Sequence, residues 1–82
     1  MRVNLDREKV TRGLQVRGMT LTELARRAGL SIPTASAAAA GHTINIRTAL
    51  SVARVLDSRP VIPELEALVP MHAESQVNGG DR

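Results

Sequence analysis

Residues 20–41 read TLTELARRAGLSIPTASAAAAG and hold two short helical patterns on either side of a glycine. Thr20 and Glu23 have the spacing of a capping box, in which the threonine hydroxyl accepts the Glu23 amide proton and the Glu23 carboxylate binds back to the Thr20 amide. A helix is expected over about residues 21–28, ended by Gly29 at a positive φ. The apolar side chains of its buried face recur at helical spacing and are Leu21, Leu24, Ala25 and Ala28.

A second helix is expected almost at once, over about residues 32–40. Ser31 is a suitable N-cap, and Pro33 is tolerated in a first turn because the amide hydrogen that proline lacks would have no partner there. The alanine-rich stretch that follows has a high helix propensity, and Gly41 ends it. Two helices joined in this way through Gly29 predict a helix-turn-helix.

Two longer helices are expected on either side of this pair. The first runs from about Asp6, an N-cap residue type, to Arg17, and the other begins after Asn45. Residues 42–44, between the helix expected over 32–40 and the helix after Asn45, are expected to form a loop, and no strand is predicted. The apolar inner face expected for the helix after Asn45 consists of Ala49, Val52, Ala53 and Leu56.

A short fifth helix is expected over residues 64–69, with Pro63 at its first position and Pro70 after its end. From residue 71 onward the chain is polar, contains two consecutive glycines and has no hydrophobic period. The sequence therefore predicts one all-α, compact five-helix domain over residues 1–70 and a flexible, disordered C-terminal tail over residues 71–82.

Composition excludes several classes of site. The 82 residues include no Cys, Phe, Tyr or Trp, so disulfides, thiolate nucleophiles, zinc–thiolate sites and base stacking on aromatic rings are excluded. His42 and His72 lack further ligand types around them, so no metal, no cofactor and no catalytic residue is predicted. No apolar run approaches the roughly 20 residues of a membrane helix, and the charged start lacks a signal-peptide core. A cytoplasmic protein without membrane contact is expected.

Charge is distributed unevenly along the chain. Residues 1–59 contain ten basic and four acidic side chains, whereas residues 60–82 contain one basic and four acidic ones. A basic body is typical of modules that bind polyanions such as DNA. Charged side chains that are only solvated would give the same numbers of basic and acidic residues. Charge alone therefore does not distinguish a DNA-binding surface from an ordinary solvated one.

The residues around the predicted turn have a characteristic identity and spacing, namely Leu24-Ala25, Gly29-Leu30-Ser31, Thr34 and Gly41. They resemble the lambda-repressor and Cro-type helix-turn-helix family, which includes the xenobiotic-response-element-type regulators. The resemblance covers about residues 6–69 and implies a lambda-repressor-like bundle that binds double-stranded DNA. No enzyme activity is expected, because the sequence contains no catalytic triad spacing, phosphate-binding glycine loop or metal-ligand set.

The resemblance also implies which residues face DNA. Base edges would be contacted by the start of the second helix of the pair and by the positions one turn later, which are Ser31, Ile32, Pro33, Ser36 and Ala37. Phosphates would be contacted by Leu21, Thr22, His42, Thr43, Asn45 and Arg47. Arg26 and Arg27 add positive charge, either at phosphate or as a solvated helix surface. His42 is either a phosphate contact or an ordinary loop histidine.

Two features depart from the family pattern. Family members usually present Gln, Arg, Lys or Asn on the second helix of the pair, because bidentate base contacts need these side chains, whereas this sequence presents Ser, Ala, Ile and Pro. Three explanations stay open: readout by methyl contacts and DNA shape, binding of protein by this helix, or introduced alanine substitutions. In addition, an ion pair common in the family is replaced by Leu14 and Ala39, which are expected to pack together.

The predicted function is sequence-dependent DNA binding by a small transcriptional regulator, such as a phage or mobile-element Cro-like repressor that occludes a promoter. A homodimer is expected, with an interface formed by Val61, Ile62, Leu65, Leu68 and Val69. Two alternatives remain. One is a DNA-binding antitoxin whose residues 60–82 bind a toxin. The other is a protein-interaction module, such as an anti-repressor or decoy, that uses the apolar helix.

Overall fold

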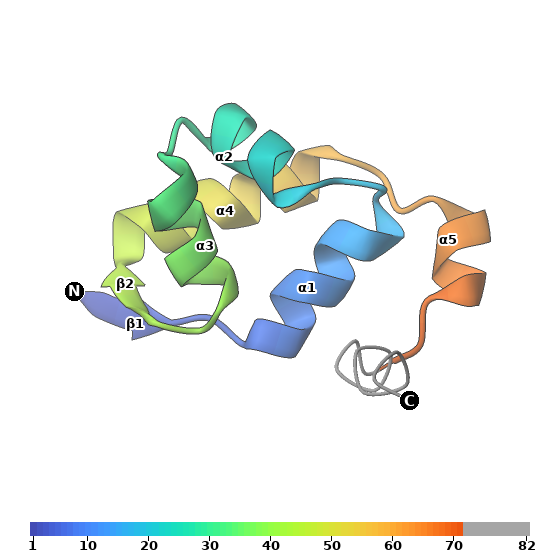
Figure 1. The fold of residues 1–82 in the computed structure, drawn as a ribbon, viewed down its shortest axis with the longest axis horizontal. Helices are drawn as coiled ribbons and strands as arrows, with labels where there is room; N and C mark the ends of the chain where they lie inside the picture. Colours follow the sequence, from blue (N-terminus) through green and yellow to red (C-terminus); the bar gives the residue numbers. More distant parts are fainter. Residues whose placement is uncertain (72–82) are drawn as a thin grey trace.

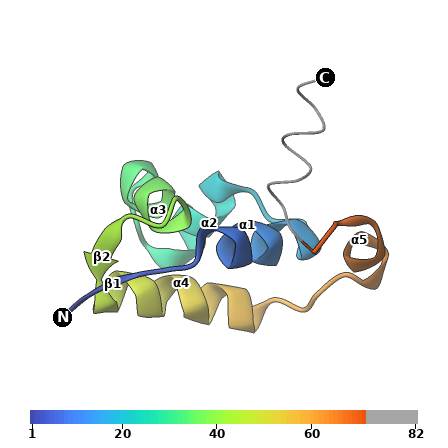
Figure 2. The ribbon, with the colours of Figure 1, turned by 90° about the horizontal axis from the view of Figure 1, so that it is seen from below.

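The computed structural model describes residues 1–71. Its elements in chain order are β1 (Arg2–Asn4), α1 (Arg7–Val16), α2 (Leu21–Ala28), α3 (Ile32–Ala39), β2 (Thr43–Asn45), α4 (Ile46–Ser58) and α5 (Pro63–Leu68). Figure 2 shows α4 along one side of the molecule, with α1, α2 and α3 on the other and α5 at the end far from the N-terminus. Apart from Met71, the expected tail lies outside the described residues. Within those residues, no helix is long and apolar enough to span a membrane.

The expected helices are confirmed, and their starts follow the local capping chemistry. Each of the first four helices has a side-chain oxygen at its N-cap that accepts a backbone N–H inside the first turn, which pairs a donor that the helix leaves unbonded. These contacts are Asp6 with Lys9 at 2.9 Å, Thr20 with Glu23 at 3.1 Å, Ser31 with Thr34 at 3.2 Å and Asn45 with Arg47 at 2.8 Å.

The core lies between α4 and the first three helices and is entirely aliphatic. Its central side chains are Leu24 of α2 and Val52 of α4, the largest that are fully buried. Leu14 is buried in the same cluster, and Ala39 packs against that cluster, while a direct contact between these two side chains stays a prediction. The buried residues are Val10, Leu14, Val16, Met19, Leu24, Ala25, Ala35, Ala38, Ile44, Ala49, Val52 and Val55.

One part of the predicted inner face of α4 is wrong. Ala53 is exposed, and Val55 is buried in its place, while Leu56 is half-buried. Each residue advances about 100° around a helix, so Ala53 lies about 100° from Val52, whereas Val55 lies within about 60° of it. The burial is therefore centred on Val52 and not between Ala49 and Ala53.

The prediction that the chain has no strand and that residues 42–44 form a loop is also wrong. β1 and β2 pair antiparallel, and Val3 lies opposite Ile44 on the inner face. The side chain of Asn4 donates to the carbonyl of Gly41 at 2.9 Å, and the Ile46 amide donates to the Met1 carbonyl at 2.9 Å. Each strand has three residues, too few for an alternating pattern to be read from either one alone.

The Glu23 carboxylate differs from its predicted place in a capping box. Instead of binding the Thr20 amide, it accepts from Arg27 Nε at 3.0 Å and from Arg59 Nη1 at 3.3 Å. The hydrogen bond from Arg27 is the main reason that the pKa of Glu23 lies below its ordinary value, and the charge of Arg59 adds to it. The carboxylate therefore links α2 to the end of α4.

The packing predicts a size limit at Ala25. This side chain is buried in α2, so Ala25→Leu should lower the free energy of unfolding by about 1–3 kcal/mol through overpacking. The matched change Ala53→Leu, on the exposed face of α4, should alter it by less than about 0.5 kcal/mol. Urea unfolding followed by far-ultraviolet circular dichroism measures both. Equal effects would contradict the corrected face of α4.

The ion pairs of Glu23 predict a pH-dependent stability. Because the pKa of Glu23 is lowered in the folded state, its contribution is present above the pKa of the unfolded chain and is lost as the pH falls through the folded-state pKa. The stability difference between the wild type and Glu23→Gln should therefore shrink between pH 7 and pH 3 in thermal unfolding. Glu66→Gln, at an exposed position of α5, is the control. A difference that is constant with pH would show that these ion pairs do not stabilise the fold.

Candidate nucleic-acid interface

The turn between α2 and α3 sets the angle between the two helices. Gly29 has φ +70°, and a Cβ added to it would meet no atom within 4 Å, so backbone conformation and not space requires glycine there. The next amide, that of Leu30, donates to the carbonyl of Ala25 at 2.9 Å and closes the turn. Ala35 and Ala38 of α3 are completely buried, which fixes the side of α3 that faces the core.

The opposite side of α3 carries the residues predicted to contact bases. Ser31, Ile32, Pro33 and Ser36 are exposed, with Ile32 retaining 52% of its accessible surface, and Ala37 is half-buried. The Ser31 hydroxyl accepts from the Thr34 amide and donates to the Thr34 hydroxyl at 2.8 Å, so it is used within the cap. The surface that remains is apolar apart from the Ser36 hydroxyl, and apolar side chains contact the methyl group of thymine.

The connection from α3 to α4 brings the next group of predicted residues to the same side. His42, Thr43, Asn45 and Arg47 are all exposed, and the Asn45 side chain caps α4. A shallow groove of about 380 Å³ runs between this connection and α3. Its lining residues are Arg2, Pro33, Thr34, Ala37, Thr43, Ile44, Asn45 and Thr48.

Arg2 lies at this groove but was not selected from the sequence. Its Nη2 donates to the Thr43 carbonyl at 3.1 Å, and its Cα is paired with that of Asn45 in the small sheet. Among the residues that the structure describes, it is the only charged side chain lining the groove. The signal that could have found it is the pair of short alternating stretches, residues 2–4 and 43–45, which is informative only once they are matched to each other.

Among the predicted phosphate residues of α2, Arg27 lines a hollow other than the groove beside α3. Thr22 and Arg26 are exposed. Arg27, in contrast, is held by Glu23 and lines a separate hollow with Ser51, Arg54 and Ser58 of α4. The structure therefore does not bring Arg27 together with the groove beside α3.

The residues predicted to form a dimer interface lie at the opposite end of the molecule, around α5 (Figure 1). Ile62 and Leu65 approach Gly18, where an added Cβ would be 3.4 Å and 3.3 Å from their terminal carbons. Val61 and Val69 are half-buried, whereas Leu68 keeps 79% of its surface and the neighbouring Met71 keeps 75%. The predicted interface residues therefore include Ile62 and Leu65, which pack near Gly18, and Leu68, which is exposed.

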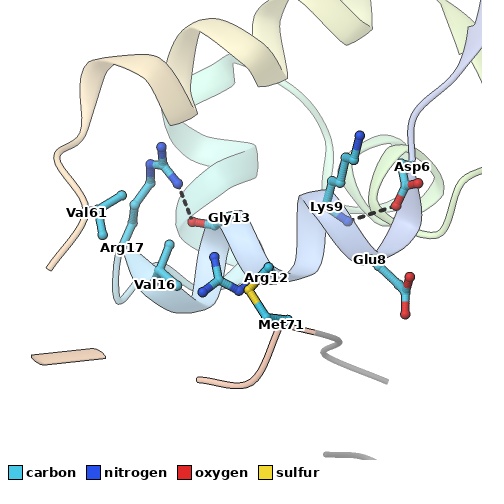
Figure 3. Close-up of a pocket in the computed structure, with 9 residues that line it drawn as sticks. All are labelled: Asp6, Glu8, Lys9, Arg12, Gly13, Val16, Arg17, Val61 and Met71. Atoms are coloured by element: carbon cyan, nitrogen blue, oxygen red, sulfur yellow. Dashed lines mark hydrogen bonds between the residues drawn. The ribbon is translucent and has the colours of Figure 1, made fainter. Parts of the chain in front are cut away.

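A further hollow, of about 530 Å³, lies along α1 on the α5 side. Figure 3 shows Val16 and Val61 among its lining residues, together with Arg12 and Met71. The Arg12 side chain is held at one edge, where its Nε donates to the Pro70 carbonyl at 3.2 Å. Within residues 1–71, no group of three or more His, Asp or Glu side chains is placed to hold a metal ion.

Comparison with known proteins identifies the family. A family model described as helix-turn-helix matches residues 15–62, which include α2, the turn, α3 and α4. No curated protein and no solved structure matches the chain. The matched segment covers more than half of the chain and contains the turn and the helix pair described above. The chain therefore belongs to the lambda-repressor and Cro-type helix-turn-helix family, whose members are sequence-specific DNA-binding regulators of transcription.

Proposed function

We propose that this protein is a transcriptional repressor, of the Cro-like kind found in phages and mobile elements, that binds an operator as a homodimer and occludes a promoter. The observation that carries the proposal is the exposed side of α3, which lies next to the exposed connection to α4. A helix presented in this way fits the major groove, while the connection beside it reaches the sugar–phosphate backbone. Residues 1–70 would form the DNA-binding domain.

The side chains available on α3 favour apolar and shape readout. Ile32 and Ala37 would contact thymine methyl groups, Pro33 would pack beside them, and Ser36 would give one hydrogen bond to a base. Specificity would then include the sequence-dependent shape of the duplex, because single contacts of this kind discriminate less than bidentate pairs.

Phosphate binding would supply most of the affinity. Arg47 lies in the first turn of α4, where unbonded backbone N–H groups also attract an anion, and Asn45 caps the same turn. Thr22, Arg26, His42 and Thr43 would extend this contact along the backbone, since all four are exposed. Arg27 is a weaker candidate for this role because Glu23 already neutralises it.

A dimer would place two copies of α3 on successive turns of the operator, about 34 Å apart. The exposed apolar side chains at the α5 end, Leu68 and Met71, are suited to a contact between two copies. The remaining residues of the proposed interface would pack beneath these two side chains in each copy, and they are Val61, Ile62, Leu65 and Val69.

The proposal is tested by selection from random duplex DNA at about 50 mM and 200 mM salt, a range over which phosphate contacts weaken strongly. The label must be extrinsic because the chain has no Trp or Tyr. We expect an enriched palindrome that persists at the higher salt. If no sequence is enriched at either salt concentration, the protein does not act as a sequence-reading regulator.

Arg47→Ala tests the phosphate contact at the start of α4. The change should weaken binding to all sequences by a similar factor and reduce the slope of log affinity against log salt by about one. Arg54→Ala removes the same charge two turns further along α4, at an exposed position away from the groove, and should leave the slope unchanged. Equal slopes for wild type and Arg47→Ala would exclude Arg47 from the backbone contact.

A second candidate function is supported by one observation, the exposure of Ile32 on a helix without long hydrogen-bond donors. A surface of this kind also suits a protein partner, as in an anti-repressor or decoy. Such a protein would bind duplex DNA weakly and without sequence preference. The antitoxin alternative depends on residues 60–82, of which only the part up to residue 71 is described.

A further inference from the structure

Helix α3, which is proposed to enter the major groove, lacks the side chains that form paired hydrogen bonds with purine bases. The sequence of α3 is IPTASAAA, and none of these residues can form the two parallel hydrogen bonds that identify guanine or adenine. Sequence-specific binding by this family nevertheless requires differences in energy between base pairs. A base contact of this kind would therefore need a side chain from another element beside the exposed side of α3.

Arg2 lies beside the exposed side of α3. It lines the groove together with Pro33 and Ala37 of α3, although 31 positions of sequence separate Arg2 from Pro33. The pairing of Val3 with Ile44 turns the Arg2 and Asn4 side chains to the outer, exposed face of the small sheet. A two-stranded ribbon and a helix are both elements that the major groove can admit.

The backbone of Arg2 is held in position. It belongs to β1, which pairs with β2, and the preceding carbonyl, that of Met1, accepts from the Ile46 amide at 2.9 Å. Arg2 is therefore part of the folded body, at a fixed distance from α3.

The Arg2 guanidinium has capacity for a second partner. Of its five N–H donors, one is used in the 3.1 Å hydrogen bond to the Thr43 carbonyl, and within residues 1–71 the others have no partner. Arg2 is exposed, and it lines the groove while making that one hydrogen bond. A planar guanidinium with two parallel donors matches the O6 and N7 acceptors of guanine.

We propose that Arg2 reads a guanine in the major groove beside α3 and so supplies the bidentate contact that α3 lacks. This inference rests on the proposed function, because it assumes that the exposed side of α3 enters the groove. It assigns the specificity of one base pair in each half-site to β1, outside the helix-turn-helix itself.

The test compares the wild type with Arg2→Ala and Arg2→Lys in selections from random duplexes, with any tag at the C-terminus. Affinities for the selected site and for its single-base variants are then measured at one salt concentration. Arg2→Ala should lose about 5- to 150-fold of discrimination at one guanine per half-site and keep the other preferences. Arg2→Lys keeps the charge but not the planar fork, so it should lose part of the same preference. Arg54→Ala should keep it entirely.

Three results would overturn the inference. Identical preferences for wild type and Arg2→Ala would show that Arg2 reads no base, and uniformly weaker binding to every sequence would make it a backbone contact. If the wild type itself enriches no sequence, the proposed function fails and this inference fails with it. Thermal unfolding by circular dichroism checks that Arg2→Ala is folded, and if it is not, Arg2→Lys decides by the same comparison.

Discussion

The close crossing of α2 and α3 is the contact on which the rest of the surface depends. The two helices can pack with their backbones near each other because side chains that they bury, Ala25 of α2 and Ala35 and Ala38 of α3, are small. Gly29 turns the chain between them at a positive φ that other residues rarely adopt. With one side of α3 fixed in this way, its opposite side is exposed, and the connection that follows α3 starts beside it.

That connection in turn determines where the N-terminal end of the chain lies. β2 is part of it, so the pairing of β1 with β2 brings the N-terminus to the side of α3 (Figure 2). At the other end, Arg17 donates to the carbonyls of Leu56 and Arg59, and Ile62 donates to the Val16 carbonyl, which holds α5 near α1. The surface proposed to bind DNA and the exposed apolar side chains of Leu68 and Met71 therefore lie at different ends of the molecule.

The sequence predicted what depends on neighbouring residues. Caps such as Ser31 and Asn45, and the terminating glycines, act within a few positions, so the bounds of the helices were close to those observed. Contacts between distant residues were missed: Glu23 binds Arg59, 36 positions away, and Arg2 binds Thr43, 41 positions away. The residues of α3 and of its connection could be proposed from a local motif, whereas the place of Arg2 depends on strand pairing that no local pattern contains.

In the proposed binding mode, duplex DNA contacts the side of the molecule formed by α3, the α3–α4 connection and β1. Titrating ¹⁵N-labelled protein with a selected duplex tests this binding mode, because every residue other than the first and the prolines reports through its amide signal. We expect saturable shifts concentrated in residues 2–4, 31–37 and 42–47. Shifts confined to α5 and the hollow along α1, or no saturable shifts at all, would contradict it.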